Sequence, residues 1–145
     1  MYYNFGGVVV NNLLERNIYD VGGNVLVCGT CLPNMEPDGY KKLSDNYDTI
    51  LYLCLEKEHI NMAITKICGM LSTGKINSLS FASVNKSPHC TQLHYIKNEI
   101  MRVMNGNMLP EINNFVIEKG EIHKIDDKVL SLSKNLVQLS IKYQE

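Results

Sequence analysis

The alternation of short apolar runs with segments of helical periodicity is the feature that most constrains the fold of this chain. Residues 25–28 are a continuous apolar run, which is typical of a strand that is buried on both faces, and residues 48–55 and 79–84 predict a second buried strand and a third strand. Segments 58–72 and 91–104 instead repeat apolar residues every three or four positions, so they predict helices with one buried face. Because strands that alternate with helices form βαβ units, the sequence predicts an α/β fold in three layers, with a mostly parallel sheet and helices on both of its faces.

Two segments lie before or between these elements. Residues 5–16 place Val9, Leu13 and Leu14 at near-helical spacing, and they predict a first helix. Residues 33–39 contain two prolines and several turn-forming residues, so they predict a loop after the first buried strand.

The C-terminal part, from about residue 113, follows a different pattern. A turn at residues 119–120 separates two short apolar segments, which predicts a β-hairpin. Residues 129–141 are amphipathic, and the predicted helix would turn Leu132, Leu136 and Leu139 inward. We expect this helix to pack on an edge of the sheet or to pair with another chain.

Size and charge limit the class of protein. With 145 residues, 45% of them hydrophobic, residues 1–145 are expected to form a single domain. The chain has 14 basic and 15 acidic residues, so it offers no basic surface for nucleic acid. Its apolar runs are far shorter than the roughly 20 residues that span a bilayer, and its first residues do not resemble a secretory signal. We therefore expect a cytoplasmic protein with neither a nucleic-acid nor a membrane partner.

The positions of the cysteines point to one edge of the sheet. The chain has five cysteines, and in a reducing compartment they are free thiols, metal ligands or catalytic groups. Cys28 and Cys31 form a C-x-x-C at the end of the first buried strand, Cys54 lies near the end of the second, and His89 and Cys90 follow the third. Since parallel strands end at the same edge, where ligands bind in open α/β sheets, these residues are expected to converge there.

Two kinds of chemistry suit such a cluster. Four thiolates would form a tetrahedral zinc shell or anchor an iron–sulfur cluster, so Cys28, Cys31, Cys54, His89 and Cys90 are candidate metal ligands. Alternatively, Cys28, Cys31 and Cys90 would carry out thiol redox chemistry with a redox protein as partner. The competing interpretation of Cys54 is that it is a small buried hydrophobic residue within its strand.

Cys90 has a second argument in its favour. It lies beside the start of the helix predicted over residues 91–104, where free backbone amides and the helix dipole favour a thiolate. His94 is four residues further on and shares its helix face, so the two predict a Cys/His nucleophile or a sulfur carrier. The alternative is that His94 is an ordinary residue of the helix surface.

The segment NVLVCGTCL, residues 24–32, resembles the strand-and-cysteine segment of DsrE-like sulfur-relay proteins. The resemblance implies a compact α/β fold, often in a homo-oligomer, that carries persulfide sulfur on Cys28 or Cys31 and exchanges it with a sulfur-relay partner. The string CGTC also resembles the C-G-P-C motif of thioredoxin-like proteins. In that fold a long helix follows the motif, whereas here Pro33 and Pro37 argue against one.

A third hypothesis assigns no chemistry to the chain. The domain would then be a subunit or an interaction module, using its C-terminal hairpin and helix. Metal content, a persulfide adduct and self-association are the measurements that separate the three hypotheses.

Overall fold

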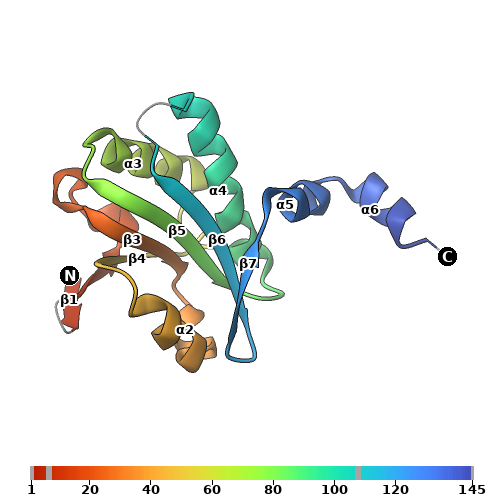
Figure 1. Cartoon of the computed structure of the whole chain (residues 1–145), viewed down its shortest axis with the longest axis horizontal. Coiled ribbons are helices and arrows are strands. Elements are labelled where there is room, and N and C mark those ends of the chain that lie inside the picture. Colours follow the sequence, from red (N-terminus) through yellow and green to blue (C-terminus); the bar gives the residue numbers. More distant parts are fainter. Residues whose placement is uncertain (1, 6–7, 107–108, 145) are drawn as a thin grey trace.

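The computed structural model describes residues 2–5, 8–106 and 109–144 and confirms the α/β class. The strands are β1 (Tyr2–Phe5), β2 (Val8–Asn12), β3 (Gly23–Gly29), β4 (Thr49–Leu53), β5 (Ile76–Val84), β6 (Glu111–Glu118) and β7 (Glu121–Ile125). The helices are α1 (Leu32–Met35), α2 (Pro37–Ser44), α3 (Ile60–Ser72), α4 (Pro88–Met104), α5 (Asp127–Lys134) and α6 (Leu136–Lys142). Figure 1 shows their arrangement around the sheet.

Within the described residues, the strands form one seven-stranded sheet in the order β1-β2-β4-β3-β5-β6-β7. The five inner strands, from β2 to β6, pair in parallel, and the two outermost strands pair antiparallel with their neighbours. The strand that ends in the C-x-x-C, β3, is the central one. In its register Cys28 lies opposite Tyr52 of β4 and Ala82 of β5.

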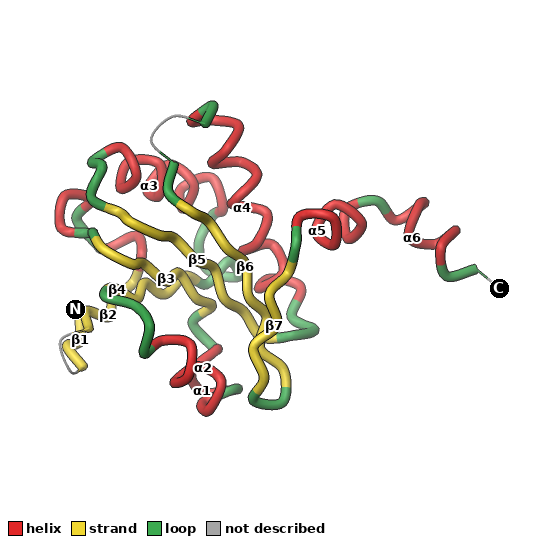
Figure 2. Tube along the Cα trace, viewed as in Figure 1, coloured by secondary structure: helices red, strands yellow, loops and turns green. Residues whose placement is uncertain are grey.

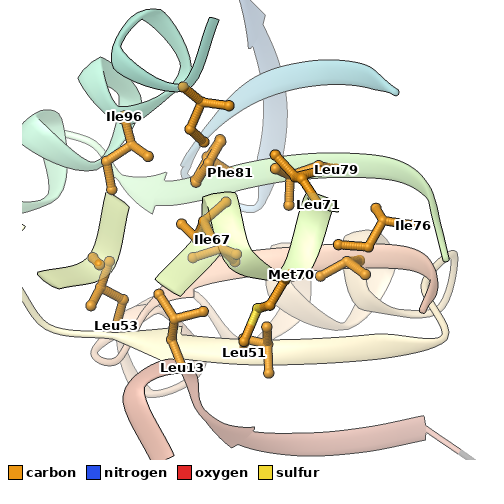
Figure 3. Packing of buried hydrophobic residues seen from close by; sticks show 14 of the residues in the cluster. Leu13, Leu51, Leu53, Ile67, Met70, Leu71, Ile76, Leu79, Phe81 and Ile96 are labelled. Carbon is orange, nitrogen blue, oxygen red and sulfur yellow. The ribbon is translucent and has the colours of Figure 1, made fainter. Parts of the chain in front are cut away.

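Helices cover both faces of the sheet, as predicted. Helices α3 and α4 lie on one side and α1 and α2 on the other (Figure 2). The core beneath α3 and α4 is built from buried hydrophobic side chains, among them Leu51, Ile67 and Phe81 (Figure 3). The smaller core beneath α1 and α2 contains Leu26 and Cys28. The side chains of β3 alternate between these two cores, which makes three layers.

The first predicted helix, over residues 5–16, is wrong. Its described part forms the end of β1, the strand β2 and a 3-10 turn at Leu13–Glu15, while residues 6 and 7 lie outside the described residues. Residues 8–10 are three consecutive valines, whose β-branched side chains favour the strand conformation. The parallel pairing of β2 with β4 provides the hydrogen bonds that decide the outcome.

The loop predicted over residues 33–39 is also wrong, because α1 and α2 occupy this segment. Both prolines lie in the first turns of these helices, where a missing backbone N–H leaves no intrahelical hydrogen bond unmade. The helical conformation is interrupted at Glu36, with φ −136° and ψ 64°, between α1 and α2. A long helix directly after Cys31 is thus absent from this described segment, as the prolines predicted.

The C-terminal hairpin is present as β6 and β7, but the single helix predicted over residues 129–141 is wrong. The helix is interrupted at Asn135, whose side chain accepts the backbone N–H of Gln138 at 3.2 Å and begins α6. Leu136 is 72% exposed rather than inward, and Leu132 and Leu139 are only partly buried. Figure 1 shows α6 extending away from the sheet.

Candidate functional site

A pocket of about 270 Å³ opens at the carboxyl edge of the sheet, beside the ends of β3 and β4 and the start of α4. Four of the five residues predicted from the sequence line it: Cys31, Cys54, His89 and Cys90. They come from three separate segments of the chain. The structure therefore brings them together as the parallel-strand rule predicts.

Two thiols from distant parts of the chain meet in this pocket. The Sγ atoms of Cys31 and Cys90 are 3.8 Å apart although the residues are 59 positions apart in the sequence. Cys31 is half-buried and Cys90 is 8% exposed. The helix predicted over residues 91–104 begins earlier, at Pro88, so Cys90 lies in the first turn of α4. Ser87 is the N-cap, and the backbone N–H of Cys90 donates to Ser87 Oγ at 3.4 Å.

Gly29, at the end of β3, makes room for this contact. A Cβ atom added to it would lie 3.0 Å from Cys90 Sγ, which is closer than side-chain atoms normally approach. The glycine of the C-G-T-C string is thus what lets the α4 thiol reach the end of β3. Sequence reasoning missed this role, although a glycine at the end of a buried strand is a signal for close approach of another group.

Cys28 does not line the pocket. Its side chain is fully buried among Leu26, Ala82 and other apolar residues of the smaller core. Burial raises the pKa of its thiol well above the ordinary value, and the nearby Cys31 and Cys90 raise it further. Cys28 is therefore a neutral, inaccessible thiol in the folded protein.

Cys31 is the most exposed member of the close thiol pair. Partial burial raises the pKa of its thiol first, and the charge of Cys90 and the hydrogen bond with it act in the same direction. Cys54 adds a smaller contribution. Cys31 is consequently held mainly as a thiol at neutral pH.

The residues around the pocket are not arranged as a ligand shell. Over the residues that the structure describes, no group of three or more His, Cys, Asp or Glu side chains is placed to hold a metal ion. His89 is exposed and Cys54 is half-buried. The feature that stands out is the pair formed by Cys31 and Cys90.

Comparison with known proteins identifies the fold family. A family model described as a Rossmann-like domain matches residues 21–145. The chain belongs to the Rossmann-like domain family. A search of curated proteins and a search of solved structures each found no match. Among the described residues of this Rossmann-like domain, no helix is long and apolar enough to cross a membrane.

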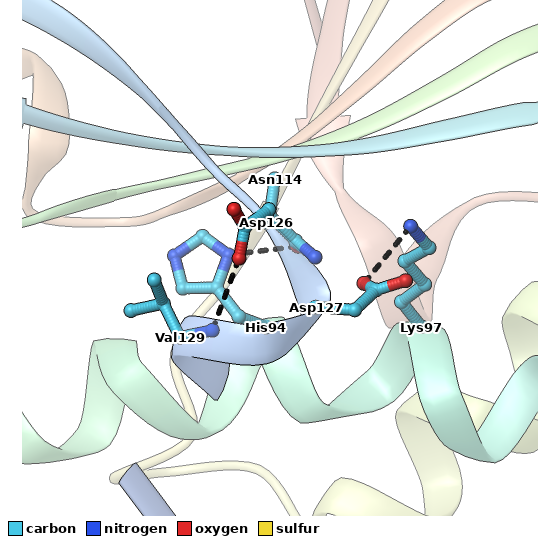
Figure 4. Close-up of polar contacts among 6 residues, drawn as sticks. All are labelled: His94, Lys97, Asn114, Asp126, Asp127 and Val129. Atoms are coloured by element: carbon cyan, nitrogen blue, oxygen red, sulfur yellow. Dashed lines mark hydrogen bonds and ion pairs between the residues drawn. The ribbon is translucent and has the colours of Figure 1, made fainter. Parts of the chain in front are cut away.

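His94 has a different place in this Rossmann-like domain from the one considered above. It is 2% exposed rather than on the helix surface. Its Nδ1 lies 2.8 Å from Asn114 Oδ1 (Figure 4), and its Nε2 lies 2.6 Å from Ser83 Oγ. Because an amide oxygen only accepts, Nδ1 carries the proton and Nε2 accepts from the Ser83 hydroxyl.

The His94 network lies beneath the start of α5 and does not line the thiol pocket. Burial lowers the pKa of His94, so its imidazole is kept neutral. An ion pair of 3.2 Å between Lys97 and Asp127 joins α4 to α5 beside it (Figure 4). His94 therefore links α4 to β5 and β6 and is not the base of Cys90. The four-residue spacing of Cys90 and His94 correctly predicted that both lie on one helix, but it did not predict a contact between their side chains.

Proposed function

We propose that this protein is a thiol-redox protein in which Cys31 and Cys90 alternate between two thiols and one disulfide. The observation that carries the proposal is the 3.8 Å separation of their sulfur atoms at the carboxyl edge of the sheet. Neither residue takes part in a disulfide in this structure. A disulfide bond is about 2.05 Å long, so rotation of the side chains has to bring the sulfurs closer.

Exposure assigns the two roles. Cys31 is the attacking residue because it is the more accessible of the pair, and Cys90, which is 8% exposed, resolves the intermediate. The Cys31 thiolate attacks one sulfur of a disulfide R–S–S–R, forms a mixed disulfide and releases one thiolate. Cys90 then attacks Cys31 Sγ, forms the protein disulfide and releases the second thiolate. Two electrons pass to R–S–S–R, and the protons of the two cysteines end on two RSH molecules.

The proposal is tested by incubating the protein with hydroxyethyl disulfide, alkylating the remaining thiols and mapping the peptides by mass. We expect the loss of two alkylatable thiols and one cross-linked pair of peptides that contain Cys31 and Cys90. Cys90→Ser should trap the mixed disulfide on Cys31. Cys68→Ser is the matched control, because Cys68 is also half-buried but lies on α3 away from the pocket. Independent alkylation of Cys31 and Cys90 without a cross-link would overturn the proposal.

Binding of zinc or an iron–sulfur cluster and formation of a persulfide stay predictions for the same group of residues. Cys31, Cys54 and Cys90 would supply thiolates to a metal, with His89 as a further ligand. If anaerobically purified protein contained zinc or iron in simple ratio to the chain, and Cys31→Ser lost it, metal binding would replace thiol redox chemistry as the proposed function. A one-sulfur mass adduct on Cys31 after incubation with a sulfur donor would instead favour sulfur transfer.

A second candidate function is self-association through the C-terminal helices, and the exposure of α6 favours it. None of its residues is buried, and Leu136, Val137 and Ile141 are all more than half exposed. A seven-residue helix is unstable alone in water, so we expect another protein surface to pack against the exposed apolar side chains of α6. A groove of about 500 Å³ between α5 and α6, lined by Leu132 and Ile141 among others, would receive α6 of a second copy in a two-fold arrangement.

Light scattering over a range of protein concentrations tests this second candidate. The full chain should be a dimer, and a chain that ends at Asn135 should be a monomer with the same urea midpoint at equal, low concentration. A monomeric full chain at all concentrations would remove the self-association proposal. That result would leave the thiol-redox proposal unaffected.

A further inference from the structure

The thiol pocket has an uneven charge. Glu56 lines it and is exposed, and no Lys or Arg is among the described residues that line it. Lys57 follows Glu56 in the chain but does not line the pocket. Besides the cysteines, His89 is the other lining side chain that ionises. Among the described residues that line the pocket, Glu56 therefore supplies a fixed negative charge and no side chain supplies a fixed positive charge.

The size and walls of the pocket restrict the substrate further. Its volume of about 270 Å³ is below the 300–1,000 Å³ of typical drug-sized sites. Leu53, Leu55 and Leu93 form apolar parts of its lining, which suits methylene groups. A short aliphatic chain fits these walls and this volume.

We propose that the pocket of Cys31 and Cys90 accepts small aliphatic disulfides that carry an ammonium group, and that Glu56 selects them over disulfides that carry carboxylates. This inference rests on the thiol-redox function proposed above and names its substrate class. The ammonium group pairs with the Glu56 carboxylate while the sulfur enters the pocket. A carboxylate on the substrate is repelled by Glu56 and by the attacking thiolate of Cys31.

The effect is moderate because Glu56 is exposed. Ion pairs at an exposed site change an equilibrium or a rate by up to about fivefold and are screened by salt. The preference is therefore expected at low ionic strength and should diminish in 0.5 M salt. Glu56 acts here as a specificity residue, since the bonds that form and break are those of the sulfur atoms.

The test compares cystamine, hydroxyethyl disulfide and dithiodiglycolate, which are cationic, neutral and anionic. The rate of formation of the Cys31–Cys90 disulfide with each is divided by the rate of a free small thiol with the same reagent, which removes intrinsic reactivity. We expect a normalised preference of cystamine over dithiodiglycolate of about fivefold in the unmodified protein at low salt. Glu56→Gln should bring this ratio close to one.

Two further variants complete the experiment. Glu58→Gln removes a carboxylate two residues away that does not line the pocket, so it should keep the preference. His89→Gln should also keep it, because the selection is assigned to Glu56. An unchanged ratio in Glu56→Gln, or an equal loss in Glu58→Gln, would overturn the inference. Failure of all three reagents to form the cross-link would instead overturn the thiol-redox function itself.

Discussion

The two faces of the sheet differ in what they bury. The face covered by α3 and α4 rests on a continuous core of buried aliphatic and aromatic side chains, among them Leu71 and Phe81. The face covered by α1 and α2 has a smaller core that includes the thiols of Cys28 and Cys90. Partly buried tyrosines, such as Tyr40 and Tyr52, pack against it. Stability is therefore concentrated on one face, whereas the reactive groups lie on the other face and at its edge.

The difference follows from the size of the helices and of the side chains. Helix α3 has 13 residues and α4 has 17, whereas α1 and α2 have four and eight. The free energy gained on burial is roughly 25 cal/mol per Å² of apolar surface, so longer helices with larger apolar residues contribute more. The pocket at the carboxyl edge is lined by residues of both cores, among them Leu53 of the larger one and Cys90 of the smaller one.

The largest expected effect on stability comes from truncating a buried leucine to alanine, which is compared between the two faces. Leu71→Ala on α3 should lower the free energy of unfolding by about 3–5 kcal/mol, because it removes a side chain from the centre of the larger core. Leu43→Ala on α2 should cost only about 2 kcal/mol, since Leu43 is slightly more exposed and lies in the smaller core. Urea denaturation measures both. An equal or larger loss for Leu43→Ala would break the comparison between the two faces.

A smaller loss is expected for Cys28→Ser. The substitution places a hydroxyl group among apolar neighbours in the smaller core, which should cost about 1–3 kcal/mol in the free energy of unfolding. Cys68→Ser, at a half-buried position on α3, should cost less than about 0.5 kcal/mol. The folded Cys28→Ser protein should still form the Cys31–Cys90 disulfide. Loss of that cross-link would show that Cys28 takes part in the chemistry.

Gly29→Ala should affect the site more than the fold. The added Cβ would lie 3.0 Å from Cys90 Sγ, so we expect a loss of about 1 kcal/mol in the free energy of unfolding and a severalfold change in the rate of disulfide formation. Gly69→Ala on α3 is the control, because its Cβ would lie 3.4 Å from the nearest atom of Ile18. Parallel rate measurements that show no difference between the two variants would contradict the role assigned to Gly29.

The smallest expected effect is a pH dependence that comes from His94. Burial lowers its pKa in the folded protein below the ordinary value of about 6.5, so the unfolded chain binds the proton more readily. The stabilising contribution is complete above pH 6.5 and is lost as the pH falls toward the pKa of the folded state. The urea midpoint should decline over this range, and the His94 ring signals in NMR should titrate below pH 6.5. A His94 titration at or above pH 6.5 would contradict the assigned tautomer network.

The local hydrophobic pattern of the sequence was sufficient to predict the central strands of the sheet. The runs at residues 25–28, 48–55 and 79–84 are β3, β4 and β5, because a strand that is buried on both faces is rich in apolar residues, although β5 also buries Ser80 and Ser83. The parallel-strand rule also placed Cys31 and Cys90 at one edge. The valines of β2 were misassigned, since their partner strand β4 lies about 40 residues away in the chain and periodicity does not register such pairing.

The rest of the site depends on contacts between distant segments. Nothing local distinguishes Glu56 from the neighbouring Glu58, and only the fold places Glu56 beside the pocket. Likewise, the polar residues near His94 in the sequence suggest an exposed position. Hydrogen bonds with Ser83 and Asn114, on two different strands, are what allow its imidazole to be buried. Sequence spacing identified the thiols because strand ends have a defined place in a parallel sheet.

If Cys31 and Cys90 form the proposed disulfide, their separation along the chain couples oxidation to folding. A disulfide between them would enclose α1, α2, β4, α3 and β5 in a covalent ring spanning 59 positions. On the chain-entropy estimate, a ring of this length stabilises the folded state by about 4 kcal/mol. By linkage, the folded chain would hold that disulfide more firmly against reductants than the unfolded chain does, by the same amount. The resistance of this domain to denaturant or protease would then report the thiol–disulfide balance around it.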